Sequence, residues 1–200
     1  MKVMKNKKAL ILFTKNPELG KVKTRLAKTV GDEKALEIYI KLLQHTKEIV
    51  QELDVDKFVF YSEAVIDDDI WEPSKFNKKV QFGSDLGSRM HNAFGDLFQL
   101  DYQSVCIIGS DCYELNSEII AGAFDDLTRN DVVIGPTFDG GYYLLGMNKL
   151  VPEFFENKNW STETVYNETL TDLENLSLTH STTVKLNDID EEKDVPQHWK

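Results

Sequence analysis

Basic side chains gather near the N-terminus of an otherwise acidic chain. The apolar run ALILFT leads into the segment KNPELGKVKTRL, which carries four cations, Lys15, Lys21, Lys23 and Arg25. The first 28 residues hold nine Lys or Arg and one acid, whereas the other 172 hold 14 bases and 33 acids. A basic loop that follows a buried strand suits a phosphate, because positive charge and backbone N–H groups then meet at one place. We therefore predict that these four cations bind the phosphates of a small ligand.

A carboxylate follows another apolar run, in the sequence VCIIGSDC. Asp111 comes directly after the strand expected at residues 104–108. In open α/β sheets ligands bind at the carboxyl ends of strands, so Asp111 is expected to face the ligand. Magnesium usually takes one or two protein carboxylates and completes its shell with substrate phosphates. The alternative is that Asp111 caps a turn or the following helix, and its position alone leaves both interpretations open.

A third group, Asp139-Gly140-Gly141-Tyr142, combines a carboxylate, two glycines and an aromatic ring. One interpretation is a hairpin tip without chemistry, since Asp-Gly-Gly is a turn signal. The other is a ligand contact. There the glycines let the backbone approach closely, Asp139 accepts a hydrogen bond from a hydroxyl, and the ring covers the ligand. The spacing alone favours neither.

Two further carboxylates, Asp188 and Asp190, lie in the acidic segment NDIDEEKD. Such a run is ordinarily a solvated acidic face. However, the two residues are separated by one position after an expected strand, so in an extended segment both carboxylates face the same side. We predict that they complete a cation site begun by Asp111.

These groups must be positioned by strands and helices, which the apolar pattern predicts in alternation. The expected strands are 9–14, 57–61, 80–82, 104–108, 131–135 and 178–184, with an extended segment at 141–147. The expected helices are 32–53, 86–100, 117–128 and 162–173, the last capped by Ser161 or Thr162. Short connections between them indicate one α/β domain over residues 1–200 with a largely parallel sheet.

Length and composition exclude several classes of protein. With 41% hydrophobic residues the chain can bury a sizeable core. No apolar run approaches the roughly 20 residues that span a bilayer. Behind the basic start MKVMKNKK the apolar run is only ALILF, and no small-residue cleavage site follows it, so a signal peptide is not expected. A net charge of −11 disfavours a nucleic-acid partner. Two cysteines stabilise little in a domain of this size, which favours a reduced, cytoplasmic location.

Other common catalytic sites are also disfavoured. The four histidines are dispersed, without a His/Cys zinc cluster or a Ser-His-Asp order. The segment Gly20-Lys21 has no glycine five residues before Gly20, so it fails the phosphate-binding pattern of P-loop ATPases.

Taken together, five motifs in order resemble a known family. They are K-N-P-E-x-G-K-x-K-T-R-L, G-S-D-C, D-G-G-Y-Y-L-L-G, W-S-T and D-I-D-x-x-x-D. The chain resembles the bacterial glycosyltransferase-like DUF2064 family over about residues 9–195. The resemblance implies a Rossmann-like three-layer α/β/α domain with the nucleotide-diphospho-sugar transferase (GT-A-like) fold. That family is similar to the molybdenum-cofactor and F420-precursor guanylyltransferases.

The resemblance also implies roles for the residues above. Asp111 becomes a metal ligand and catalytic residue, with Asp188 or Asp190 as the second ligand of Mg²⁺ or Mn²⁺. Asp139 becomes a second catalytic residue, and with Gly140, Gly141 and Tyr142 it faces the acceptor or sugar. The implied substrates are a nucleotide sugar or an NTP, together with a small-molecule acceptor.

Three functions follow from these roles. The first is glycosyl transfer from a nucleotide-diphosphate sugar. The second is nucleotidyl transfer from an NTP to a phosphorylated acceptor. The third is a non-catalytic nucleotide-binding module. The chain lacks the compact Gly-x-Gly-Thr-Arg segment typical of nucleotidylyltransferases, which favours glycosyl transfer.

Overall fold

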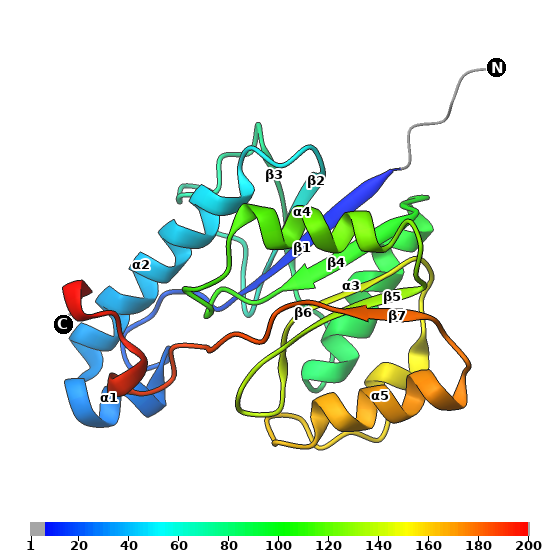
Figure 1. Cartoon of the computed structure of the whole chain (residues 1–200). Helices are drawn as coiled ribbons and strands as arrows, with labels where there is room; N and C mark the ends of the chain where they lie inside the picture. Colours follow the sequence, from blue (N-terminus) through cyan, green and yellow to red (C-terminus); the bar gives the residue numbers. More distant parts are fainter. Residues whose placement is uncertain (1–6, 200) are drawn as a thin grey trace.

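The strands of this chain form one seven-stranded sheet in the computed structural model, which describes residues 7–199 (Figure 1). Their order across the sheet is β3-β2-β1-β4-β6-β5-β7. Residues 1–6, the start of the segment considered as a signal peptide, lie outside the described residues. The bounds of the strands are β1 Lys8–Thr14, β2 Asp56–Tyr61, β3 Phe76–Val80, β4 Ser104–Ile108, β5 Val132–Pro136, β6 Tyr142–Met147 and β7 His180–Thr182.

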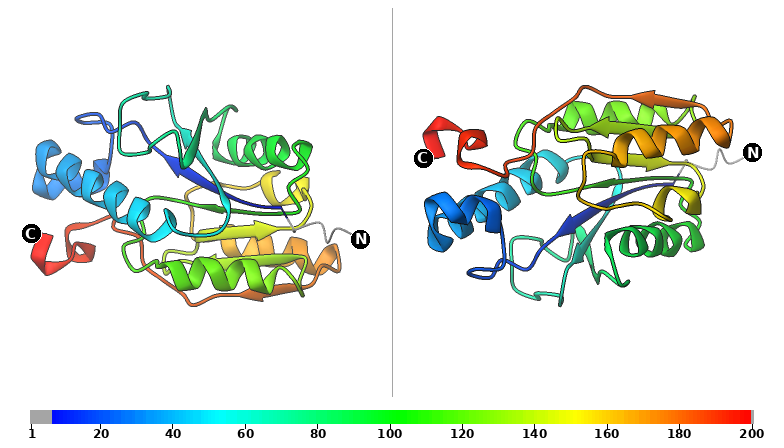
Figure 2. Two further views of the ribbon diagram at one scale, coloured as in Figure 1. Left: turned by 90° about the horizontal axis from the view of Figure 1, so that it is seen from above. Right: turned by 90° about the horizontal axis from the view of Figure 1, so that it is seen from below.

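Helices cover both faces of the sheet. The helices α2 and α4 lie on one face, and α3 and α5 lie on the other (Figure 2). This arrangement confirms the three-layer α/β/α prediction. The bounds are α1 Thr24–Val30, α2 Asp32–Val50, α3 Leu86–Gln99, α4 Ser117–Asp126, α5 Val165–Asn175, and the 3₁₀ turns η1 Pro152–Phe155, η2 Glu192–Asp194 and η3 Gln197–Trp199.

Strand β1 shows why the sheet needs two helical layers. All four residues from Ala9 to Leu12 are buried. Because successive side chains of a strand point to opposite faces, Leu10 and Leu12 pack in the cluster with α2 and α4. Ala9 and Ile11 pack in the cluster with α3. A central strand buried on both faces is typical of α/β sheets with parallel neighbours.

The sheet is parallel except at β6, which pairs antiparallel with both β4 and β5. Only residues 137–141 connect β5 to β6. A connection this short can close a hairpin but cannot cross over the sheet to start a parallel strand. The Asp-Gly-Gly segment is therefore a hairpin tip at the carboxyl end of β5.

The predicted elements agree with the structure in type, with four differences. The sequence pattern missed α1, a single short helix with one buried residue, Leu26. The strand expected at 80–82 shares only Val80 with the observed strand β3, which begins at Phe76. Its lysines obscured the pattern: the Lys78 ammonium is buried and lies 2.8 Å from Asp69. The strand expected at 178–184 extends only over β7.

The fourth difference is the start of α5. The prediction placed a helix cap at Ser161 or Thr162, and this is wrong, because α5 begins at Val165. Ser161 has a φ of 65°, a left-handed conformation that a right-handed helix cannot include. The helix therefore starts only after this residue.

None of the helices in residues 7–199 is both long and apolar enough to cross a bilayer. The longest, α2, has 19 residues and buries one face against the sheet while its other face carries charges.

Candidate functional site

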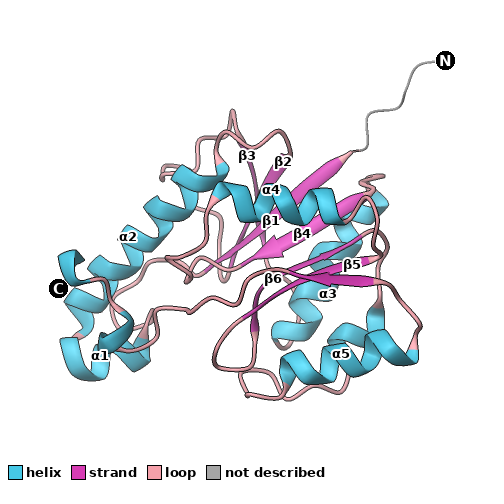
Figure 3. Cartoon of the chain, in the orientation of Figure 1, coloured by secondary structure: helices cyan, strands magenta, loops and turns pink. Residues whose placement is uncertain are grey.

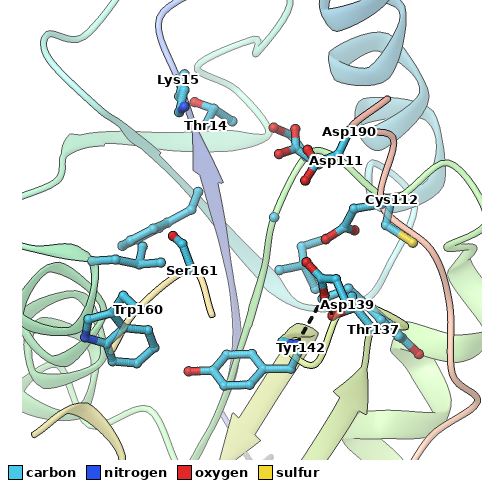
Figure 4. A pocket seen from close by; sticks show the side chains of 18 of the residues that line it. Thr14, Lys15, Asp111, Cys112, Thr137, Asp139, Tyr142, Trp160, Ser161 and Asp190 are labelled. Atoms are coloured by element: carbon cyan, nitrogen blue, oxygen red, sulfur yellow. Dashed lines mark hydrogen bonds between the residues drawn. The ribbon is translucent and has the colours of Figure 1, made fainter. Parts of the chain in front are cut away.

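A pocket of about 530 Å³ opens at the carboxyl ends of β1 and β4 (Figure 4). The carboxyl ends of the strands are the position at which open α/β sheets bind ligands. The pocket brings together parts of all five sequence motifs. Nine of the predicted site residues line it, namely Lys15, Lys23, Arg25, Asp111, Asp139, Gly141, Tyr142, Asp188 and Asp190. The other two, Lys21 and Gly140, are not among its lining residues.

The hydroxyl of Tyr39, on α2, joins the two loops that form the pocket wall. It accepts a hydrogen bond from the Lys15 backbone N–H at 2.7 Å and donates to the Lys15 carbonyl at 3.1 Å. It also lies 3.3 Å from the Ser110 hydroxyl. Burial raises the pKa of Tyr39, with the Asp111 charge adding to the shift. The apolar pattern of residues 32–53 predicts a helix but not this role, which only the partners of Tyr39 show.

Asn16 does the same for the loop after β2. Its side-chain amide donates to the Ala64 carbonyl at 2.8 Å and accepts from the Glu63 backbone N–H at 3.0 Å. Its own backbone N–H donates to the Ser62 hydroxyl at 3.1 Å. The nearly buried Asn16 side chain thus ties the basic segment to the loop after β2. No short-range pattern around Asn16 predicts this role.

The basic segment divides into two functional parts. Lys21 points away from the pocket, where its ammonium lies 2.7 Å from Glu18 and 3.5 Å from Glu63. Lys23 turns inward because its backbone is left-handed, with φ of 47°, immediately before α1. Of the four cations predicted to bind phosphates, three line the pocket. Lys21 does not, because its ammonium is paired with two acids outside the pocket.

The Lys23 ammonium lies between two carboxylates. It is 3.0 Å from Asp111 and 3.5 Å from Asp190, and its side chain is only 4% exposed. Burial lowers the pKa of Lys23, but attraction to Asp111 and Asp190 exceeds this effect, so the pKa is raised overall. Arg25, on α1, pairs with the other oxygen of Asp190 at 3.0 Å and is mostly exposed.

The C-terminal segment brings the last acids to this point. The chain between β7 and η2 is a loop that returns beside α1 (Figures 1 and 3). The Ile189 side chain is buried, and its backbone N–H donates to the Asp111 carbonyl at 2.9 Å. This bond places Asp188 and Asp190, on either side of Ile189, next to Asp111. The segment is therefore docked, and not the solvated acidic face considered as the alternative.

Asp188 is the most strongly perturbed carboxylate of the pocket. Burial, followed by the negative charge of Asp111, raises its pKa to about 7, against an opposing effect of Lys23. The pocket thus holds more negative charge than Lys23 and Arg25 neutralise. Such a site favours binding of a further cation.

The helix-cap alternative for Asp111 does not describe the structure. Asn116 caps α4, since its side chain accepts from the Ile119 backbone N–H at 3.0 Å. The Asp111 carboxylate instead contacts Lys23. Among residues 7–199, no three carboxylate, imidazole or thiolate groups converge to form a complete metal site. The donor set fits a cation that takes one or two protein carboxylates and fills its shell with phosphate and water oxygens, as Mg²⁺ does.

The β5–β6 hairpin tip is the turn that one interpretation of its sequence predicts, and its Asp139 also lines the pocket. One oxygen of Asp139 accepts from the Thr137 hydroxyl and from the Gly141 backbone N–H at 3.2 Å. These bonds orient the carboxylate at the pocket wall. Gly140 is not a lining residue of the pocket, and a Cβ there would lie 2.1 Å from the Glu163 carbonyl oxygen. Its lack of a side chain lets the segment before α5 approach the hairpin.

One hydroxyl in the pocket wall has no partner. The Thr14 Oγ1 atom, at the end of β1, is buried and makes no hydrogen bond within the described residues. Leaving a buried hydroxyl unpaired costs about 1–3 kcal/mol. A ligand that accepts or donates a hydrogen bond there would recover this cost.

Comparison with known proteins identifies the family. The profile of DUF2064, described as "Uncharacterized protein conserved in bacteria", matches residues 45–162. The chain belongs to the DUF2064 family. A search of curated proteins found no match.

Solved structures share the fold of this DUF2064 protein. A "putative nucleotide-diphospho-sugar transferase" from Desulfovibrio desulfuricans is 33% identical, with a TM-score of 0.84 over 92% of this chain and 82% of that one. The inositol-1-phosphate CTP transferase of T. maritima is 12% identical, with a TM-score of 0.56 over 97% and 94% of the two chains. The 4-diphosphocytidyl-2C-methyl-D-erythritol synthase of Anaerococcus prevotii is 12% identical, with a TM-score of 0.59 over 94% and 92%. The last two show likeness of fold alone.

Proposed function

We propose that this DUF2064 protein is a glycosyltransferase that uses a nucleotide-diphosphate sugar as donor and a divalent cation, Mg²⁺ or Mn²⁺. The observation that carries the proposal is the group formed by Lys23 with Asp111 and Asp190 at the carboxyl ends of β1 and β4. It combines the two features that bind a diphosphate, cations for its oxygens and carboxylates for its metal. The 33% identical relative carries a name of the same transferase class.

In this proposal, Asp111 and one of the pair Asp188 and Asp190 hold the cation. When bound, the cation supplies positive charge next to the diphosphate oxygens. The Lys23 and Arg25 side chains, released in part from their carboxylates, bind those same oxygens. Lys15, exposed at the pocket rim, extends the basic wall toward the nucleoside.

Glycosyl transfer then needs one bond made and one broken. The oxygen of an acceptor hydroxyl bonds to the anomeric carbon of the sugar, and the bond from that carbon to the diphosphate oxygen breaks. Asp139 takes the proton of the acceptor hydroxyl, since the bonds to Thr137 and Gly141 hold its carboxylate at the pocket wall. Lys23 and Arg25 stabilise the negative charge that develops on the leaving nucleoside diphosphate.

The test is thermal unfolding with matched nucleotides. UDP-glucose and GDP-mannose are compared with UTP, GTP and CTP, each with MgCl₂ or MnCl₂ and each with EDTA instead. A ligand at 100 times its Kd adds about 2.7 kcal/mol to the free energy of unfolding. We expect metal-dependent stabilisation by a nucleotide sugar and none by the triphosphates.

Two results would contradict the proposal. Stabilisation by an NTP but by no nucleotide sugar would identify nucleotidyl transfer instead. Absence of any nucleotide effect, with and without metal, would exclude both transferase functions.

A further inference from the structure

The pocket has a second end without charged side chains. Its described charged lining residues are the three cations Lys15, Lys23 and Arg25 and four aspartates. Asp111, Asp188 and Asp190 lie beside the basic segment, whereas Asp139 lies on the β5–β6 hairpin tip, between that group and the other end. The other end, here called the ring lobe, is lined by apolar and aromatic side chains, namely Leu86, Met90, Tyr142, Trp160 and Val165. In Figure 4 the Trp160 and Tyr142 rings lie together, away from Asp111 and Asp190.

Trp160 is fixed in this position by a close contact. A Cβ on Gly87, in the first turn of α3, would lie 2.4 Å from the indole nitrogen of Trp160. Only glycine at this position lets the indole lie against α3. The left-handed Ser161 then turns the chain away, so the indole remains at the pocket wall. A ring held this way can stack on a ligand with little loss of rotamer entropy.

Tyr142 supplies a polar group to the same lobe. Its hydroxyl is 3.9 Å from the Met90 sulfur, a weak acceptor. Burial raises the pKa of Tyr142, so the hydroxyl stays protonated and can donate to a ligand oxygen. The ring lobe therefore offers a stacking surface and a neutral hydrogen-bond donor. It offers no Lys, Arg or His for an anion within the described lining.

We infer that the ring lobe binds the acceptor, and that the acceptor is an uncharged ring compound, a carbohydrate or an aromatic alcohol, and not a phosphorylated one. This inference rests on the proposed function, because it places the acceptor hydroxyl next to Asp139, between the ring lobe and the diphosphate site. A phosphate transferred from water to this lobe would lose its hydration without gaining a cation. Nucleotidyl transfer to an acceptor phosphate does not suit this geometry.

The experiment compares two probes that share one sugar. Binding of p-nitrophenyl β-glucoside and of glucose 1-phosphate is measured by ligand-observed NMR titration. The protein is held with Mg²⁺ and a saturating nucleoside diphosphate, so that the basic site is already filled. The variants are Trp160→Ala, Trp160→Phe and Gly87→Ala, which displaces the indole without removing it. Phe138→Ala, an aromatic residue 65% exposed at the hairpin tip and outside the pocket lining, is the control.

We expect the neutral glucoside to bind at least fivefold more tightly than glucose 1-phosphate. Trp160→Ala and Gly87→Ala should each weaken glucoside binding at least fivefold, while Trp160→Phe and Phe138→Ala retain most of it. The thermal shift produced by the nucleoside diphosphate should stay the same in every variant.

Three results overturn the inference. The first is tighter, Trp160-dependent binding of glucose 1-phosphate. The second is no binding of the glucoside at 20 mM while the nucleoside diphosphate still binds. The third is a loss of nucleoside diphosphate binding in Trp160→Ala and Gly87→Ala alike, which would place the nucleotide in the ring lobe. If no nucleotide binds the unmodified protein, the proposed function fails instead, so the two failures are distinguishable.

Discussion

The Lys23 ammonium lies 3.0 Å from a carboxylate oxygen of Asp111, and this contact joins the segment after β1 to the turn after β4. The lysine is nearly buried, whereas the Asp111 side chain is 43% exposed. The charge pair therefore lies at the border between protein and pocket. A ligand can therefore reach the Asp111 carboxylate without displacing the Lys23 side chain.

Removing this ammonium should destabilise the protein. Lys23→Met keeps the apolar stem but leaves Asp111 and Asp190 without their shared cation. We expect the free energy of unfolding to fall by about 1–3 kcal/mol, the lower part of the range for a lost charge partner because both aspartates are partly exposed. Urea unfolding measures the loss, and added Mg²⁺ should restore part of it.

The control is Arg25→Met, which removes a mostly exposed partner of Asp190 and should change the free energy of unfolding by less than about 1 kcal/mol. Equal losses in the two variants would contradict the special position of Lys23.

Asp111→Ala should abolish the metal-dependent part of nucleotide binding. The carboxylate is the donor that faces both Lys23 and the pocket, so its loss leaves a cation without its principal ligand. We expect at least a tenfold weaker nucleotide affinity in the presence of Mg²⁺, measured by calorimetry. Asp125→Ala is the matched control, since that side chain is 78% exposed on α4. An unchanged affinity in Asp111→Ala would remove this residue from the site.

Thr14→Val should separate stability from ligand binding. It replaces a buried, unpaired hydroxyl by a methyl group of similar shape, so the unliganded protein should be equally stable or more stable, by up to about 1 kcal/mol. If the hydroxyl bonds to the ligand, nucleotide affinity falls several-fold in the same variant. Thr14→Ser keeps the hydroxyl and should retain the affinity. A loss of stability in Thr14→Val would show that the hydroxyl has a partner within the protein.

Gly140→Ala should disrupt the hairpin tip. The position has a φ of 89°, and a Cβ would overlap the Glu163 carbonyl. We expect a loss of about 2–4 kcal/mol in the free energy of unfolding, from backbone strain together with overpacking. Gly122→Ala, on α4 with open space around the new methyl group, should instead raise stability by up to about 1 kcal/mol. A neutral Gly140→Ala would mean that the segment before α5 can move away at no cost.

The sequence predicts those features whose causes are local. The strand at Ser104–Ile108 is found at its expected bounds, because this buried run lies between a polar residue, Gln103, and a glycine, Gly109. Asp188 and Asp190 meet at one pocket because the strand period puts them on the same side of an extended segment. The fold class follows from alternating elements, and the structure and the family confirm it.

Features that depend on distant partners were missed. Tyr39 meets Lys15 across 24 positions, and Asn16 meets Ala64 across 48, so neither leaves a pattern in a short window. The position of Lys21 outside the pocket was missed for the same reason, because its partner Glu63 is 42 positions away in the sequence. The start of α5 was misplaced because Ser161 has a left-handed backbone, and serine has no strong preference for that conformation that a sequence pattern could show.

During synthesis, Lys23 leaves the ribosome 167 residues before its partner Asp190. At about 5–20 residues per second this interval is about 8–33 s. In that time β1, β2 and β3 can pair, because all three come from the first 80 residues, but the acids beside Ile189 have not yet been made. Under the proposed function, an unfinished chain therefore lacks a working cation site and cannot retain a nucleotide. Under the same proposal, a nucleotide adds stability only to molecules in which the segment around Ile189 has docked against Asp111.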